Sequence, residues 1–191
     1  MSNTRIDIDP EGDVLIILPL KKIFSETENS ETPQEKHYLC SKKHLTLASR
    51  RAAKIFASQF KEASQEEDGL HHWKFDGTFN DQAFEIILKI IHGKTRHIPR
   101  TTNLDLLANI ATIVDDLECH EAVAFFTINW LFGYPSGATE IRGKALAQLI
   151  LASFVFEHAV LFETYTKMAI RYNDGALSTF ELPIRGDISS K

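Results

Sequence analysis

Cysteine is scarce in this sequence. Cys40 and Cys119 are the only two among 191 residues, and they stand far apart in the chain. Two isolated thiols do not make the disulfide framework on which small secreted domains depend. A chain of this length buries about 70% of its unfolded surface, so it holds a core without covalent staples. We therefore expect a reducing, intracellular location, and the sequence does not distinguish cytoplasm from nucleus.

Long apolar runs are also missing. The longest, at residues 14–20 and 149–156, are far shorter than the roughly 20 residues that a membrane-spanning helix needs. The polar, acidic residues 1–11 lack the charged-then-apolar pattern of a signal peptide. No membrane partner is expected.

The chain has no excess of positive charge. Its formal net charge is -5, whereas a general nucleic-acid binder must neutralise phosphates. A basic patch is present at Lys94, Arg96, His97 and Arg100, but no stacking aromatics interleave it. We expect no nucleic-acid partner, and the patch indicates a loop that complements helix C-termini or an acidic surface.

Motifs of covalent catalysis are absent. Ser136 lies in Gly-Tyr-Pro-Ser-Gly, which has the wrong offset for a Gly-x-Ser-x-Gly nucleophile. No glycine-rich phosphate loop precedes a predicted helix. Asp115 and Asp116 are adjacent on a predicted helix and diverge by about 100°, so they do not form an acid/base pair. The sequence assigns no catalytic residue and no cofactor.

Candidate metal ligands are scattered along the chain as His37, Cys40, His44, Cys119 and His120. A structural zinc site needs four converging nitrogen or sulfur ligands, and this spacing matches no compact zinc motif. We expect no metal. A metal-dependent or otherwise unrecognised small enzyme stays the alternative interpretation, and stoichiometric metal in the purified protein or a cleft of titratable groups would favour it.

The most informative segment is a predicted helix that Asn80 caps and Gly93 ends. Its apolar positions form one wide arc of Phe84, Ile86, Ile87, Leu88, Ile90 and Ile91. Gln82, Glu85 and Lys89 remain as its polar residues. An arc this wide buries a helix against more than one surface, either a core alone or a core and a partner.

Other elements follow from shorter patterns. Apolar or alternating runs predict strands at 14–18, 36–40 and 71–75, with a mobile loop at 25–34 that makes the first two a hairpin. Ser41 and Ser49 are expected to cap two short helices. Thr102 with Asp105 resembles a capping box that begins a helix at residue 104. Further helices are predicted at 120–132, 142–155 and 157–173, and the apolar residues of the tail are compatible with another strand.

This order of elements resembles the BTB/POZ domain, and its fungal branch in particular. The motifs that carry the likeness are GDVLIIL from residue 12, SKKHLTLAS from 41, IIHG from 90, HIPR from 97, VDDLECHEA from 114, and Trp130. One departure is Ala52, where family members usually carry a large aromatic, and we expect Phe56 to fill that volume.

The resemblance implies an α+β fold with a small, mostly N-terminal sheet, a flanking cluster of helices and a C-terminal helical extension. The expected organisation is a flexible leader (1–11), a BTB/POZ-like domain (12–132), a linker (133–140), the helical extension (141–175) and a tail (176–191). Members that dimerise through an exchanged N-terminal strand carry a longer leader than residues 1–11.

The resemblance also implies a non-catalytic protein–protein interaction module. Some relatives bind a cullin scaffold as adaptors of ubiquitin ligases, and others dimerise and recruit transcriptional partners. In cullin-binding relatives the helix that matches 84–93 supplies an acidic contact, for which Glu85 is nearest, with Ala83 at the neighbouring apolar position. The candidate partner-binding residues are therefore Gln82, Glu85 and Lys89, and the candidate partners are a cullin scaffold or a second copy of the chain.

Overall fold

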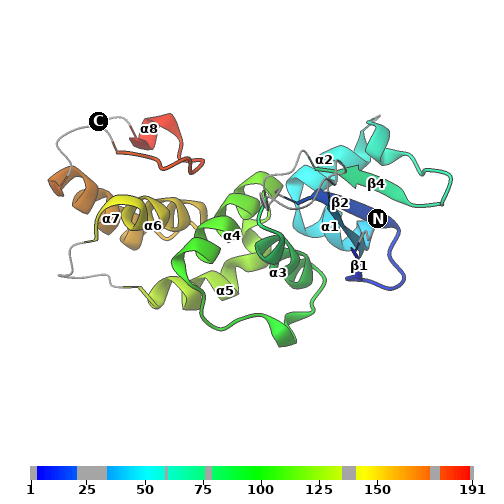
Figure 1. The fold of residues 1–191 in the computed structure, drawn as a ribbon, viewed down its shortest axis with the longest axis horizontal. Helices are drawn as coiled ribbons and strands as arrows, with labels where there is room; N and C mark the ends of the chain where they lie inside the picture. The colour runs from blue at the N-terminus through cyan, green and yellow to red at the C-terminus, as the bar shows by residue number, and fades with distance from the viewer. Residues whose placement is uncertain are drawn as a thin grey trace, which may run out of the picture. The chain divides into compact units, whose positions relative to one another are not determined.

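The structure, a computed structural model, describes residues 4–20, 34–58, 60–75, 79–134, 141–172 and 177–189 (Figure 1). The chain divides into two compact units. One comprises Met1–Ile98 with Leu117–Cys119, and the other comprises Pro99–Asp116 with His120–Lys191. The strands belong to the first unit and most helices to the second, which confirms the predicted α+β class. The predicted domain bounds stay a prediction.

The first unit contains a mixed sheet of four strands in the order β1-β3-β2-β4. These strands are β1 (Thr4–Asp7), β2 (Val14–Pro19), β3 (Glu35–Cys40) and β4 (His71–Lys74). β2 and β3 pair antiparallel, as the predicted hairpin requires, while β1 joins β3 and β4 joins β2 in parallel. β2 lies inside the sheet and is buried along nearly its whole length, which explains its continuous apolar run. The predicted loop at 25–34 lies almost entirely outside the described residues.

The N-terminal segment differs from the expected flexible leader. Thr4–Asp7 forms β1 and continues into Ile8, which is only 2% exposed. The Asp9 amide donates to the Leu39 carbonyl at 2.9 Å, so the edge of β3 is paired rather than open. Gly12 then turns the chain against β3, where a Cβ atom would lie 2.5 Å from the Cys40 carbonyl oxygen. The alternating isoleucines explain why this segment packs on the sheet.

The described residues of the first unit also form the helices α1 (Lys42–Ala48), α2 (Arg50–Ala57) and α3 (Asp81–Ile91), and 3-10 turns at Lys61–Ala63 and Thr95–His97. The predicted caps are confirmed, since Ser41 Oγ accepts from His44 N and Ser49 Oγ accepts from Ala52 N at 3.0 Å. Phe56 is buried with its ring edge-on to Trp73, at 5.7 Å between centroids.

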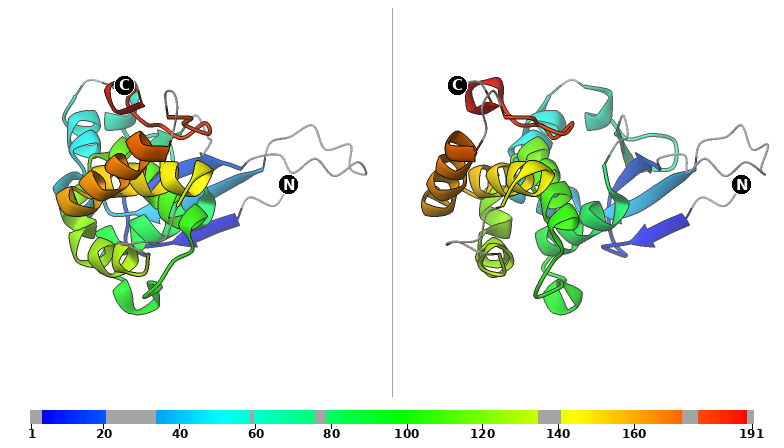
Figure 2. Two further views of the ribbon diagram at one scale, coloured as in Figure 1. Left: turned by 90° about the vertical axis from the view of Figure 1, so that its left-hand side faces the viewer. Right: turned by 60° about the vertical axis from the view of Figure 1, so that its left-hand side comes forward.

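The second unit is helical. Its elements are α4 (Leu104–Leu117, whose last residue belongs to the first unit), α5 (His120–Phe132), α6 (Gly143–Val155), α7 (Ala159–Tyr172) and the short α8 (Gly186–Ser189). The predicted helices agree with α5, α6 and α7 to within two residues. α6 and α7, yellow and orange in Figure 2, run side by side.

The tail contains no strand within the described residues 177–189. Phe180 and Glu181 have φ values of 51° and 65°, which break the extended conformation that alternating apolar residues would need. The chain turns there, with the Leu182 amide donating to the Thr179 carbonyl at 2.9 Å. The expected strand is therefore wrong.

α4 begins at Leu104 as predicted, but its cap differs from the prediction. Asn103 Oδ1 accepts from Leu106 N at 2.8 Å, so Asn103 and not Thr102 caps the helix. Asparagine is at least as strong a cap as threonine, and this one stands one residue closer to the helix. Asp105 turns instead towards α6, where its carboxylate accepts from Lys144 Nζ at 2.8 Å and from Gln148 Nε2 at 2.7 Å. The predicted capping box is not formed.

No described helix combines the length and the apolar character that crossing a bilayer would require.

Candidate partner-binding surfaces on two helices

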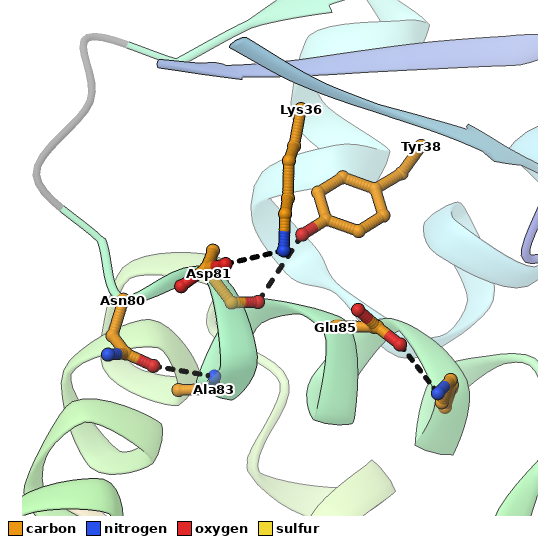
Figure 3. A network of polar contacts seen from close by, with 7 residues as sticks. Lys36, Tyr38, Asn80, Asp81, Ala83 and Glu85 are labelled. Carbon is orange, nitrogen blue, oxygen red and sulfur yellow. Dashed lines mark hydrogen bonds and ion pairs between the residues drawn. The ribbon is translucent and has the colours of Figure 1, made fainter. Parts of the chain in front are cut away.

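The start of α3 is fixed by three contacts (Figure 3). Asn80 Oδ1 accepts from Ala83 N at 2.9 Å, which confirms the predicted cap. Asp81, in the first turn, accepts from Lys36 Nζ at 2.5 Å, and the Asp81 carbonyl accepts from Tyr38 Oη at 3.3 Å. Lys36 and Tyr38 belong to β3, so the sheet holds the first turn of α3 in place.

Electrostatics favours the same arrangement. The hydrogen bond from Lys36 lowers the pKa of Asp81, so the carboxylate is charged near neutral pH. Its charge in the first helical turn also complements the helix dipole. Burial raises the pKa of Tyr38, and the nearby charges of Glu85 and Asp81 raise it further, so the hydroxyl stays a neutral donor.

The end of α3 is fixed by a histidine. His92 Nδ1 donates to the Leu88 carbonyl at 2.7 Å, while its Nε2 accepts from Ser41 N at 3.0 Å. One ring nitrogen must carry the proton and the other must lack it, so only neutral His92 satisfies both contacts. Burial lowers the pKa of His92, and the electrostatic interaction with His44, whose ring centroid lies 5.1 Å away, lowers it further. Sequence reasoning missed this contact because it joins residues 51 positions apart.

The apolar arc of α3 is covered within one chain. Its buried residues are Ala83, Phe84, Ile86, Ile87, Leu88, Ile90 and Ile91. Ile86 and Ile90, which widened the predicted arc, are each only 7% exposed. The arc therefore gives no reason to place a second copy against α3. Ala83 is fully buried as well, so it is not available for the apolar contact that the family resemblance gave it.

What α3 presents to solvent is a polar strip, which consists of Gln82, Glu85 and Lys89. Gln82 is exposed, and the other two are partly exposed. Positions i, i+3 and i+7 lie along one helix face, so the structure brings the three predicted partner-binding residues together. Glu85 and Lys89 also form an ion pair at 2.6 Å (Figure 3).

α5 presents a different surface. Its buried residues are Val123, Thr127, Trp130 and Leu131, and Trp130 Nε1 donates to the Pro99 carbonyl at 2.8 Å. The opposite side exposes Phe125 (76%), Ile128 (50%) and Phe132 (69%). Sequence reasoning predicted a helix at 120–132 but did not identify this exposed side. The available signal was that α5 has no charged residue after Glu121.

The other candidate residues do not assemble into a site. Cys40 and Cys119 are buried, and burial raises the pKa of the Cys40 thiol. His37 Nε2 lies 3.1 Å from a carboxylate oxygen of Glu35, its neighbour on the same strand. In the part of the chain that the structure describes, no three His, Cys, Asp or Glu side chains gather as metal ligands would. Within the basic patch, Lys94, Arg96 and His97 are exposed residues of the first unit, whereas Arg100 belongs to the second.

Comparison with known proteins adds no relative. A scan against protein-family models finds no matching family, and a search of curated proteins finds no match. The family resemblance thus depends on the sequence motifs and the order of elements.

Proposed function

We propose that this protein is a non-catalytic protein–protein interaction module of BTB/POZ type, and that the polar strip on α3 contacts a cullin-type scaffold. The observation that carries the proposal is the contrast within α3. Every apolar side chain of the helix is buried, both helix ends are fixed, and Gln82, Glu85 and Lys89 face outward along one side. A rigid surface loses little conformational entropy when a partner binds it.

The charged residues of the polar strip are better suited to orienting a bound partner than to raising the affinity for it. The Glu85 and Lys89 side chains are 25% and 30% exposed, so their ion pair is partly withdrawn from water. Charged groups held in a fixed geometry set the register of an interface and reject wrong partners. Because Ala83 is buried, apolar contacts with the scaffold have to come from another element of the first unit.

A charge swap tests this proposal. Glu85→Lys with Lys89→Glu keeps an ion pair at i,i+4 but reverses the charge pattern that a partner meets. The matched control is Glu163→Lys with Lys167→Glu on α7, another i,i+4 pair, at 2.5 Å. Titration calorimetry with a purified cullin N-terminal domain should show affinity at least about 10-fold weaker for the α3 swap, a loss of about 1.4 kcal/mol. The control should bind as the wild type does.

Two results would count against the proposal. If the α3 swap binds as tightly as the wild type, the strip is not the contact surface. If the wild-type chain shows no binding to the cullin domain, the scaffold is not the partner.

A further inference from the structure

The exposed side of α5 forms a continuous apolar stripe, which we define as Phe125, Ile128 and Phe132. These residues stand at i, i+3 and i+7 and so share one face of the helix. They are 76%, 50% and 69% exposed, while Val123, Thr127, Trp130 and Leu131 form the buried side of α5, the helix labelled in Figure 1. Single exposed apolar residues are ordinary on soluble proteins, but a contiguous stripe with two aromatics marks an interaction surface.

We propose that this stripe is the interface of a homodimer, in which the α5 helices of two copies pack antiparallel about a twofold axis. In such an isologous contact the same patch serves both copies. An axis between residues 126 and 127 places Phe125 of one copy over Ile128 of the other, and Glu121 over Phe132.

The polar groups at the two ends of the stripe support a second copy of this chain. Glu121 is the only acidic or basic residue on the exposed face, and it stands at the N-terminal end of α5. At the other end the ring of His158 lies edge-on to Phe132, at 5.8 Å between centroids. An antiparallel pair therefore brings Glu121 of each copy towards His158 of the other, whereas a parallel pair would oppose two Glu121 carboxylates.

The hydrogen bond of His158 fits this arrangement. Its Nδ1 accepts from Leu161 N at 3.4 Å, at the start of α7. In the neutral ring the proton is then on Nε2, which can donate to a carboxylate. His158 thus offers a donor that suits a Glu121 carboxylate.

The exposed area sets the expected strength. The three side chains together expose roughly 400 Å² per copy, so their pairing removes roughly 800 Å² from water. Stable interfaces bury about 1,200–2,000 Å², and obligate dimers bury more. We therefore expect a weak dimer that forms and dissociates with concentration.

Sedimentation equilibrium of the full chain, over about a hundredfold range of concentration, tests the proposal. The variant Phe125→Glu places a charge in the stripe at a residue that is not part of the core. The matched control is Leu47→Glu on α1, where Leu47 is 81% exposed. We expect wild type and Leu47→Glu to dimerise alike, and Phe125→Glu to raise the dimer Kd at least about 10-fold. Circular dichroism shows whether each variant keeps the wild-type helix content.

A rescue experiment tests the orientation. Glu121→Lys should weaken the dimer because it faces His158, and adding His158→Glu should restore it by recreating an opposite-charge pair. A monomeric wild type at every concentration, a dimer that Phe125→Glu leaves intact, or a loss of the dimer in Leu47→Glu would overturn the proposal. These results are independent of the cullin titration, because the stripe and the α3 strip lie in different units.

Discussion

α3 and α5 are both apolar helices of similar length, yet they expose opposite kinds of surface. All apolar residues of α3 are buried, and its outward side carries Gln82 and the Glu85–Lys89 pair. α5 leaves Phe125 and Phe132 largely exposed. Apolar content therefore does not say which face of a helix is covered, because that depends on the elements packed around it. A polar strip suits orientation and specificity, whereas an apolar stripe supplies the area that drives association.

The largest expected effect is on the free energy of unfolding when one aromatic residue in each helix is replaced by alanine. Phe84 is fully buried, and its ring centroid lies 5.0 Å from that of Phe75 and 5.9 Å from that of Tyr38. Phe84→Ala should lower the free energy of unfolding by about 3–5 kcal/mol, because it leaves a cavity. Phe125→Ala should change it by less than about 0.5 kcal/mol in the monomer. Urea denaturation at low protein concentration measures both, and similar losses would mean that α5 is as well covered as α3.

An effect of intermediate size is expected at the end of α3, where both nitrogens of His92 are engaged. The pKa of His92 is lowered in the folded state, so the unfolded chain binds a proton more readily. The contribution of His92 to stability is complete above the ordinary histidine pKa of about 6.5 and declines as pH falls below it. Protonation would leave the Ser41 amide without its acceptor, which would lower the free energy of unfolding by about 1–2 kcal/mol.

Urea denaturation from pH 8 to pH 5 checks this prediction. His92→Gln retains a donor and an acceptor but does not titrate, so its stability should decline less at acid pH than that of the wild type. The control His97→Gln changes an exposed residue and should keep the wild-type slope. Parallel pH profiles for wild type and His92→Gln would show that the His92 contacts do not fix the helix end.

The smallest expected effect concerns the ion pair of the polar strip. Glu85→Gln should lower the free energy of unfolding by only about 0.2–0.5 kcal/mol, as is usual for an i,i+4 pair. The difference from wild type should shrink in about 1 M salt, where such charges are screened within about 3 Å. Denaturation at low and high salt measures it. A loss above about 2 kcal/mol would make Glu85 a structural residue and weaken its role in binding.

Local signals in the sequence predicted much of the fold. A continuous apolar run predicted β2, and Ser41, Ser49 and Asn80 predicted three helix starts, because a cap depends on residues within one turn. The same reasoning misplaced the cap of α4 by one residue, since Thr102 and Asn103 are both good caps and only the folded chain selects one.

What the sequence missed depends on contacts between distant residues. β1 carries the charged Arg5 and Asp7 and resembles a solvated leader, and it becomes a strand only because β3 offers a free edge. The three polar residues of α3 were identified as those outside its apolar arc, because helical spacing is local. The exposed face of α5 was not identified, since an apolar helix gives no sign of which side the rest of its unit leaves open.

Hydrogen exchange of the wild-type chain at two protein concentrations tests the contrast between the helices most directly. If α5 is covered by a second copy, amides of residues 120–132 should exchange more slowly at the higher concentration, while those of residues 81–91 should exchange at the same rate in both samples. Exchange in 120–132 that does not depend on concentration, or slowing that appears in 81–91 instead, would contradict the account.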